Sequence, residues 1–257
     1  MASFPDHFSA TAADYAAFRP RYPDALFAWI VAHAPARRRA WDCGAGSGQA
    51  AVALAEHFDF VVATDASGAQ LARAAPHPRV RYAVMTAERA ALATGSADVV
   101  TVAQAFHWFD HDRALPEIHR VLRNPGSLAL VWNMRDLDDP LQRGVEDLLR
   151  AVRKEVPGQV AGTWREPLAR SPLFRPATVG AFTYEQRFTT DDLCDRVAST
   201  SFVAALPSVD REELFVRIRA LTHGLSEPFP FPYKTEVHLI PRSGDRPAAS
   251  RAHSNQG

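Results

Sequence analysis

A glycine-rich segment, with one acidic residue near its start and another on the following strand, carries the clearest chemistry in this sequence. The segment WDCGAGSGQ runs from Trp41 to Gln49, and the next apolar run ends at Asp65. Gly44, Gly46 and Gly48 let the backbone turn sharply out of a strand and approach a ligand closely, because glycine has no Cβ to block either. Asp65 offers two acceptor oxygens for a ribose diol. The pattern therefore predicts a site for a nucleoside-bearing cofactor.

Asp42 indicates which class of cofactor fits this site. A dinucleotide would bring a pyrophosphate to the turn. The following helix N-terminus would favour that negative charge, but Asp42 would repel it. S-adenosylmethionine carries an ammonium and a sulfonium and no phosphate, so the same carboxylate would attract it. The Gly-x-Gly-x-Gly spacing is also one residue shorter than the dinucleotide fingerprint. A plain strand-to-helix turn, with Asp42 capping the next amides, would explain the residues too.

Composition limits the partners and the location that we expect. The chain of 257 residues carries 29 basic and 29 acidic side chains, a balance that gives no global field to attract nucleic acid or an anionic membrane. Cys43 and Cys194 fit neither a disulfide framework nor a zinc site, and His111 and His119 lack partners at metal-ligand spacing, so we expect no metal. The sequence starts without a secretory signal and has no run of about 18 apolar residues, which favours a cytoplasmic protein.

Strand and helix patterns alternate around the glycine segment. A helix is predicted over residues 23–34, before the first strand. Further strands are predicted over 60–64, 80–84, 98–103 and 127–132, and further helices over 49–58, 67–75 and 110–122. Pro116 should delay the start of the last helix or kink it. The alternation predicts an α/β fold with a doubly wound, mostly parallel sheet and a central strand at 98–103. The glycine segment, Asp65 and the residues after Ala103 would then meet at the carboxyl edge of the sheet.

The second half of the chain has a weaker pattern. It predicts a helix over 141–154, a strand over 179–188, capped helices that begin near 190 and 210, and a final edge strand over 233–240. Without an internal repeat or a clean linker, we predict one domain over residues 1–242, with a cofactor-binding core at about 36–135 and a cap with the last strands at about 136–242. The composition of residues 243–257 predicts a disordered tail.

Several motifs in a fixed order give the chain a family resemblance. The chain resembles the class I S-adenosylmethionine-dependent methyltransferases, and within them the small-molecule group that includes trans-aconitate methyltransferase-like proteins. The resemblance spans residues 8–240 and depends on these motifs: Tyr15-x-x-x-Arg19-Pro20-x-Tyr22-Pro23, the glycine segment with Asp42, Thr64-Asp65-Ala66-Ser67, Ala87-Glu88, AQAFHWF at 103–109 and RVLRNPG at 120–126. One departure, Asn124-Pro125-Gly126-Ser127 in place of Lys-Pro-Gly-Gly, affects a turn and bears little on chemistry.

The resemblance implies a Rossmann-like fold of seven strands with an antiparallel last strand, an amino-terminal helical extension and a small cap. It also implies S-adenosylmethionine as cofactor. The implied contacts are Gly44, Gly46 and Gly48 with Asp42 at the methionine part, Asp65 and Ala66 at the ribose, Ala87 and Glu88 at the adenine, Gln104 after the fourth strand, and Tyr15 and Arg19 closing over the site.

His107 and Trp108 are the candidate catalytic residues. A neutral imidazole can accept a proton from a hydroxyl nucleophile, and an aromatic face stabilises a nearby sulfonium, for which Tyr15 would serve as well as Trp108. Equally, His107 could only orient a neighbour while the aromatic rings pack.

The resulting hypothesis is methyl transfer to an oxygen, nitrogen or carbon of a small-molecule acceptor, with a carboxylate or a hydroxyl as candidate groups, by a monomer or homodimer. A carboxylate needs no base because it is already ionised. An acidic acceptor would need a cationic clamp, for which Arg135 and Arg19 are the candidates by chain position. Two alternatives are a nicotinamide-dependent oxidoreductase, which Asp42 opposes, and a non-catalytic cofactor-binding protein of the same fold.

Overall fold

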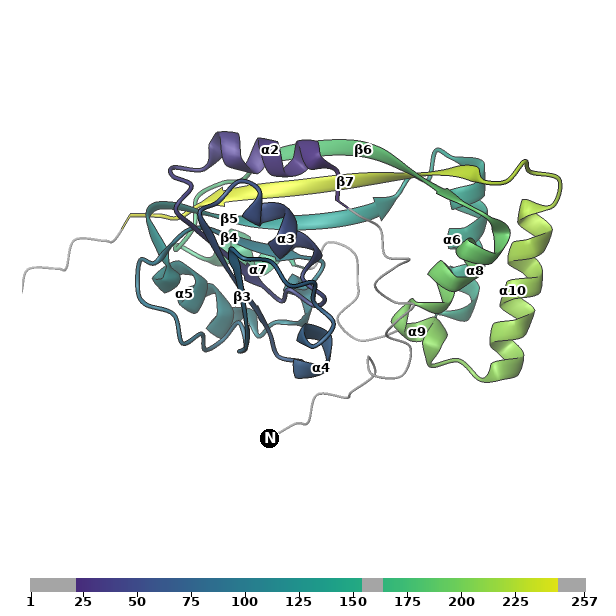
Figure 1. Cartoon of the computed structure of the whole chain (residues 1–257), viewed down its shortest axis with the longest axis horizontal. Coiled ribbons are helices and arrows are strands. Elements are labelled where there is room, and N and C mark those ends of the chain that lie inside the picture. Colours follow the sequence, from purple (N-terminus) through teal and green to yellow (C-terminus); the bar gives the residue numbers. More distant parts are fainter. Residues whose placement is uncertain (1–21, 154–163, 245–257) are drawn as a thin grey trace, which may run out of the picture.

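A seven-stranded mixed sheet forms the centre of the computed structural model, which describes residues 22–153 and 164–244 (Figure 1). The strands are β1 (Arg39–Cys43), β2 (Phe60–Asp65), β3 (Val80–Val84), β4 (Ala97–Ala103), β5 (Leu122–Arg135), β6 (Thr178–Phe188) and β7 (Phe229–Pro241). Their order across the sheet is β3-β2-β1-β4-β5-β7-β6. The first five run parallel, and β7 is antiparallel to both of its neighbours. This arrangement confirms the predicted fold class.

Helices cover both faces of the sheet, as a doubly wound fold requires. They are α2 (Asp24–His33), α3 (Gln49–Ala55), α4 (Gly68–Leu71), η1 (Phe106–Trp108, a 3₁₀ turn), α5 (His111–Val121), α6 (Pro140–Val152), α7 (Arg165–Arg170), α8 (Thr190–Ala198), α9 (Ser201–Ala204) and α10 (Ser208–Thr222). Apolar residues of α2 and α3 share one buried cluster with one face of the sheet. Those of α5, with Leu168 of α7 at the margin, share a second cluster with the other face. β4 is buried on both faces, which explains its uninterrupted apolar sequence.

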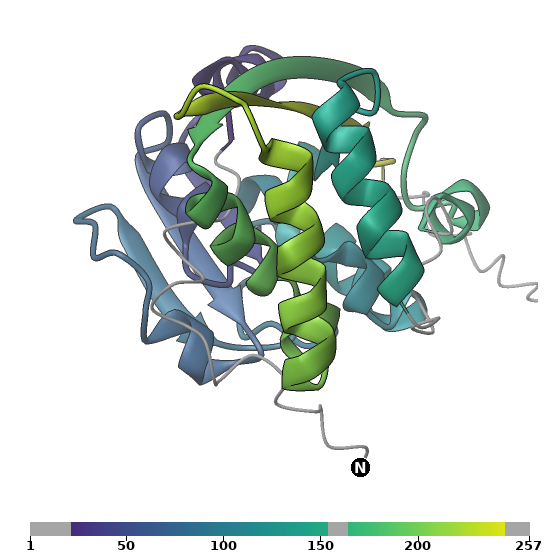
Figure 2. The ribbon, with the colours of Figure 1, turned by 90° about the vertical axis from the view of Figure 1, so that its right-hand side faces the viewer.

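The helices α6, α8 and α10 form the cap, which encloses a third apolar cluster at the end of β5, β6 and β7 away from the glycine-loop core. Its side chains come from α6, α8 and α10 and from the projecting ends of β6 and β7. Figure 2 shows α6, α8 and α10 from the cap side, with α10 beside α6. Because β5, β6 and β7 run through both parts, one continuous sheet joins the cap to the core (Figure 1).

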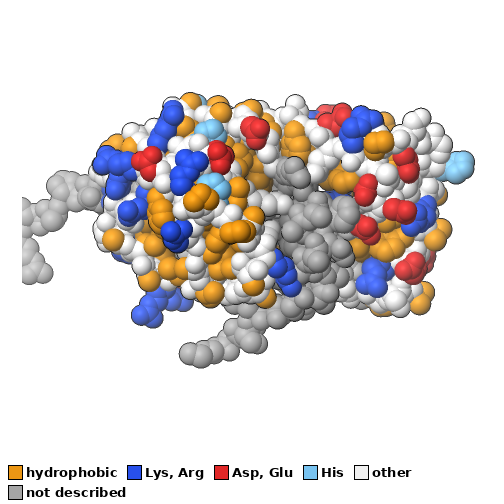
Figure 3. All heavy atoms as spheres, viewed as in Figure 1, with side chains coloured by type: hydrophobic (Ala, Val, Ile, Leu, Met, Phe, Trp, Pro, Cys, Tyr) orange, Lys and Arg blue, Asp and Glu red, His pale blue; other side chains and the backbone are white. Residues whose placement is uncertain are grey.

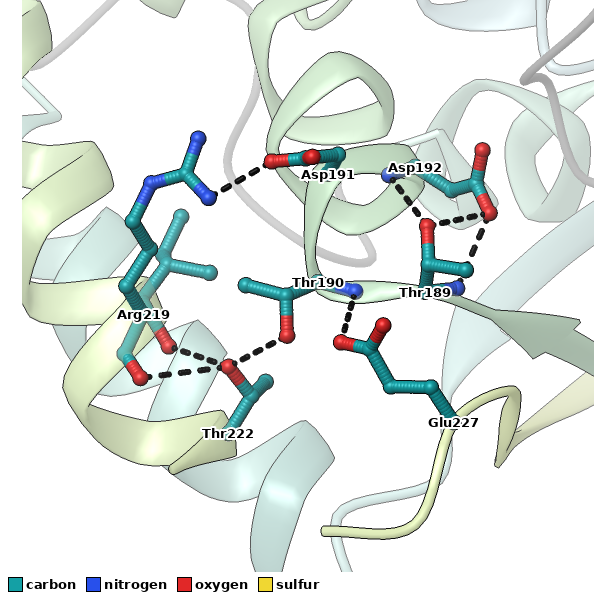
Figure 4. A network of polar contacts seen from close by, with 8 residues as sticks. Thr189, Thr190, Asp191, Asp192, Arg219, Thr222 and Glu227 are labelled. Atoms are coloured by element: carbon teal, nitrogen blue, oxygen red, sulfur yellow. Dashed lines mark hydrogen bonds and ion pairs between the residues drawn. The ribbon is translucent and has the colours of Figure 1, made fainter. Parts of the chain in front are cut away.

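A polar network fixes the entry of α8 into the cap (Figure 4). Thr189 and Asp192 form a reciprocal capping box: the Thr189 hydroxyl accepts from the Asp192 amide, and the Asp192 carboxylate accepts from the Thr189 amide. The Thr190 amide donates to Glu227 at 2.8 Å, and Arg219 of α10 pairs with Asp191 at 2.6 Å. The network therefore ties α8 to α10 and to the loop before β7.

Figure 3 shows that acidic and basic side chains are interspersed over the cap helices on the face it presents. Among the described residues, no helix has the length and apolarity that a bilayer span needs.

Three elements differ from the sequence-based expectation. The helix predicted over 67–75 contains only α4, because the chain tightens after Leu71 into i to i+3 hydrogen bonds ahead of Pro76. Pro116 lies inside α5 and does not delay its start, which is at His111. The strand predicted at the sheet edge is β7, which instead lies between β5 and β6, so that β6 is the edge. Alternation alone reports burial and not strand order.

Other predicted elements agree more closely. Ser67 caps α4 by accepting from the Gln70 amide. β5 is longer than predicted because it begins at Leu122, before the Asn124-Pro125-Gly126 turn, where its register with β4 shifts. Ser243, the first residue of the predicted tail, donates its amide to the Leu173 carbonyl at 2.8 Å. Residues 245–257 lie outside the described part of the chain.

Candidate active site

The glycine segment turns out of β1 into α3 with all three glycines in the left-handed region. Their φ angles are +76° at Gly44, +56° at Gly46 and +80° at Gly48, which side chains rarely adopt. An added Cβ at Gly44 would lie 2.6 Å from the Ala105 Cβ, and one at Gly48 would lie 2.6 Å from the Tyr82 hydroxyl. At Gly46 it would meet nothing within 4 Å. The loop thus packs tightly at its two ends and leaves open space at its middle.

Asp65, at the carboxyl end of β2, is held by this loop. Its two carboxylate oxygens accept the amides of Gly46 and Ser67, each at 2.8 Å. The amides of Gly44 and Ala45 also donate to the Thr64 carbonyl, which fixes the loop on the end of β2. These bonds use one lone pair on each Asp65 oxygen and leave others for a diol. Glycine loop and carboxylate therefore meet at one edge, as the sequence predicts.

Asp42 is fully buried in β1 beside this edge. Neither carboxylate oxygen has a hydrogen-bond partner of ordinary geometry within residues 22–153 and 164–244. Burial, and next the negative charge of Asp65, raise the pKa of Asp42 to about 7, although the nearby Ala51 amide offsets part of the shift. A buried carboxylate without a donor is costly unless a ligand completes it. Asp42 therefore suits a ligand that brings a positive charge or a hydrogen-bond donor.

Ala87 and Glu88 follow β3 and border the same edge. Ala87 is buried and Glu88 is half-buried. The Glu88 carboxylate accepts the Asp110 amide at 3.0 Å and so ties this loop to the start of α5. Ala66, next to Asp65, is exposed. The contacts of Ala66, Ala87 and Glu88 with a cofactor stay predictions.

Gln104 directly follows β4 and has a strained backbone, because its φ of +59° is rare for a residue with a side chain. Its side-chain amide donates to the Asn133 carbonyl on β5 at 3.3 Å. The Asn133 side chain in turn accepts from the Thr235 hydroxyl of β7. Residues from three neighbouring strands thus meet where the chain leaves β4.

His107 lies in η1, just beyond Gln104. Its ring centroid lies 4.7 Å from that of Trp108 and 5.7 Å from that of Trp132. Burial, and next the charge of His111, lower the pKa of His107 to about 4. The imidazole is therefore neutral at pH 7. Trp108 is 43% exposed, so its role as a wall for a methyl group stays a prediction.

Tyr15 and Arg19, the expected closing residues, lie outside the described residues. Arg135 is half-buried, and its guanidinium donates to Glu146 at 3.1 Å and to Gln142 at 3.2 Å. Among the described residues, no group of three or more His, Cys, Asp or Glu side chains could hold a metal ion.

Sequence reasoning missed several side chains of this region. Tyr82 of β3 packs against the glycine loop, and Trp132 of β5 stacks on Trp164 at 5.4 Å. Tyr184 of β6 and Tyr233 of β7 stack at 5.4 Å beneath the cap. Alternating aromatic residues in predicted strands were the available signal, but such residues are more often ordinary core.

Comparison with known proteins gives one consistent result. Residues 41–130 match the family model described as a methyltransferase domain. An uncharacterized methyltransferase of Mycobacterium tuberculosis is 34% identical over 217 residues, which are 83% of this chain and 84% of that protein. An uncharacterized methyltransferase-like protein of Schizosaccharomyces pombe is 32% identical, over 82% of this chain and 84% of the relative.

A solved structure agrees with these sequence relatives. It is named "Putative Type II Methyltransferase from Anaeromyxobacter dehalogenans" and is 34% identical to this chain. It superposes with a TM-score of 0.69 over 87% of this chain and 97% of its own. The similarity therefore includes the cap as well as the glycine loop.

Proposed function

The chain belongs to the class I S-adenosylmethionine-dependent methyltransferases, and on this premise we propose that it methylates an oxygen of a small-molecule acceptor, a carboxylate or a hydroxyl. The observation that carries the proposal is the unpartnered, buried carboxylate of Asp42 beside a loop of left-handed glycines. The family relationship disfavours a nicotinamide-dependent oxidoreductase and a non-catalytic binding protein. The motif similarity to trans-aconitate methyltransferase-like proteins favours the carboxylate.

The residues at the carboxyl edge fit S-adenosylmethionine. Asp42 lacks the cation that an ammonium would provide, and the space above Gly46 is open. Asp65 would accept the ribose hydroxyls, oriented for this by the amides of Gly46 and Ser67. When bound, the cofactor supplies a methyl group that its sulfonium activates. Ala66, Ala87, Glu88 and Gln104 would complete the pocket from neighbouring strand ends.

The protein's own contribution is alignment and the exclusion of water. Gln104, Asn133 and Thr235 link the end of β4 to β5 and to the middle of β7, so the acceptor side of the site is built on rigid strands. His107 stays neutral at pH 7, but a pKa of about 4 makes its imidazole a weak base. Such a residue suits an acceptor that is already ionised, since a carboxylate has no proton to lose.

Calorimetric titration with S-adenosylmethionine, S-adenosylhomocysteine and NAD in parallel tests the cofactor. Binding of the first two without NAD is expected. Release of S-adenosylhomocysteine in the presence of small carboxylic acids, phenols and alcohols then tests the acceptor class. Turnover confined to amines or to macromolecules would overturn the proposed acceptor.

A further inference from the structure

Beneath the cap, three buried hydrogen-bond donors have no acceptor. The hydroxyls of Tyr184 and Tyr233 and the Nε of Arg196 are buried, and none has a hydrogen-bond partner within residues 22–153 and 164–244. The whole Tyr233 side chain is 2% exposed. Buried polar groups nearly always have partners, so three unmatched donors in one region indicate a group that they are built to receive.

The backbone brings these donors together. Tyr184 stands directly opposite Tyr233 across the β6–β7 pair, and Tyr233 stands opposite Arg135 across the β7–β5 pair. Directly opposed residues point to the same face of a sheet. Arg196 is on α8, which packs against β6, and it is near enough for its charge to act on both Arg135 and Tyr184.

Positive charge is in excess at this row. Arg135 and Arg153 both pair with Glu146, at 3.1 and 3.7 Å. Arg196 donates to the Ser199 hydroxyl at 3.2 Å, and no carboxylate in the described part of the chain forms an ion pair with it. An oxyanion would match both the excess charge and the free donors, because carboxylate and phosphate oxygens accept several hydrogen bonds at once.

The row also lies on the acceptor side of the proposed active site. Arg135 follows Asn133 by two residues on β5, and Asn133 contacts Gln104 at the carboxyl edge. Two residues of strand span roughly 7 Å. A small molecule could therefore reach from this row to the methylation site.

We propose that Tyr184, Tyr233 and Arg196 form a binding site for an oxyanion of the acceptor, a group distinct from the one that is methylated. The inference rests on the proposed function, because it assumes that the acceptor lies between the cap and the carboxyl edge. The acceptor is then a molecule with at least one carboxylate or phosphate besides its methylated oxygen.

Two kinds of measurement test the site on the full chain. The first is the thermal unfolding midpoint without ligand. Tyr184→Phe/Tyr233→Phe removes two buried hydroxyls that have no partner, so its midpoint should equal or exceed that of the unmodified protein. Tyr82→Phe is the matched control, because the Tyr82 hydroxyl already donates to the Ala75 carbonyl at 2.9 Å and its loss should lower the midpoint. A midpoint of the double variant as low as that of the control would overturn the proposal.

The second measurement is the rise of the midpoint with succinate and with inorganic phosphate, at constant ionic strength, against succinamide as the uncharged blank. The unmodified protein should be stabilised by at least one of the two anions, and the better one identifies the oxyanion. The double variant and Arg196→Gln should bind it about tenfold more weakly or worse. Arg187→Gln, in which an exposed arginine on the same strand is lost, should bind it unchanged.

Failure of the site is distinguishable from failure of the proposed function. Each variant is also titrated with S-adenosylhomocysteine, whose affinity should not change. A protein that binds S-adenosylhomocysteine but is stabilised by neither anion would refute the oxyanion site alone. Absence of S-adenosylhomocysteine binding would refute the proposed function. The effect of the anions on the unfolding midpoint can still be measured in that case, because it does not require cofactor.

Discussion

Asp42 and Asp65 lie on adjacent parallel strands, yet only Asp65 has hydrogen-bond partners of ordinary geometry among the described residues. Asp65 accepts two loop amides, and its charge helps to raise the pKa of Asp42. One carboxylate is thus oriented before any ligand arrives. The carboxylate of Asp42 has no such donors in the described part of the chain, and a ligand with a positive charge would compensate it.

Asp42→Asn should stabilise the ligand-free protein above pH 7. The pKa of Asp42 is about 7 when folded and about 3.8 when unfolded, so the folded state holds a proton that the unfolded state has lost between those values. The free energy of unfolding therefore falls as pH rises from about 4 to 7 and then levels off. Removing this carboxylate should recover up to roughly 4 kcal/mol. Chemical denaturation at pH 5 and pH 8 measures it.

Asp98→Asn is the matched control for that experiment. Asp98 is another buried carboxylate of the sheet, but it accepts the Arg38 and Arg39 amides at 2.9 Å and the Arg123 guanidinium at 3.0 Å. Its replacement should destabilise the protein. If both variants lost stability alike, Asp42 would not be the uncompensated group described above.

Cofactor affinity should depend on the ionisation of Asp42. Only the carboxylate form of Asp42 attracts an ammonium. Binding of S-adenosylhomocysteine should therefore weaken as the pH falls below about 7, because Asp42 of the free protein becomes protonated there. Calorimetric titration across that range would reveal the dependence. Asp42→Asn should bind weakly at every pH, and a pH dependence that survived in the variant would have to come from another group.

Asp65→Ala should weaken S-adenosylhomocysteine binding by about 1–3 kcal/mol, because charged hydrogen bonds to the ribose would be lost. The loop should loosen as well, since the amides of Gly46 and Ser67 lose their acceptor. Calorimetry gives the affinity and hydrogen exchange reports the loop. Unchanged affinity would remove Asp65 from the cofactor site.

Gly46→Ala and Gly95→Ala separate backbone strain from cofactor contact. Both glycines have a left-handed φ, +56° and +61°, and an added Cβ meets nothing within 4 Å at either. Each variant should therefore lose about 1 kcal/mol of stability. Gly95 precedes β4 at the opposite edge of the sheet, so only Gly46→Ala should also weaken cofactor binding, by tenfold or more as the methyl group enters the cofactor's space. Equal affinities in the two variants would contradict the assigned position of the cofactor.

His107→Ala should distinguish the two acceptor groups. With a carboxylate, turnover should change little because no proton has to leave. With a hydroxyl, loss of a general base would cost about 10²–10⁴-fold in turnover at unchanged cofactor affinity. The variant is assayed on acceptors of both kinds, and a large loss on a carboxylate would show that His107 orients the acceptor.

The meeting of the glycine loop with Asp65 could be predicted because it is local. Gly44, Gly48 and Asp65 lie within one βαβ unit, where chain order and spatial order agree. The meeting of Tyr184 with Tyr233 could not be predicted, because they are 49 positions apart and are paired only through strand order. The place of β7 in the sheet could not be predicted either, because its alternating sequence indicates a strand but not the neighbours of that strand. The low pKa of His107 depends on tertiary burial, which the sequence HWF does not encode.

The position of β7 also sets the order in which the molecule can be completed during synthesis. β7 is the last of these strands to be made, yet it lies between β5 and β6. The backbone groups of β5 and β6 that face β7 therefore stay unpaired until residues 229–241 leave the ribosome. Among the five parallel strands, β1 to β4 have all their neighbours earlier, and β5 lacks only β7. A nascent chain can therefore assemble the cofactor edge first, while the row of Arg135, Tyr233 and Tyr184 exists only in the finished polypeptide.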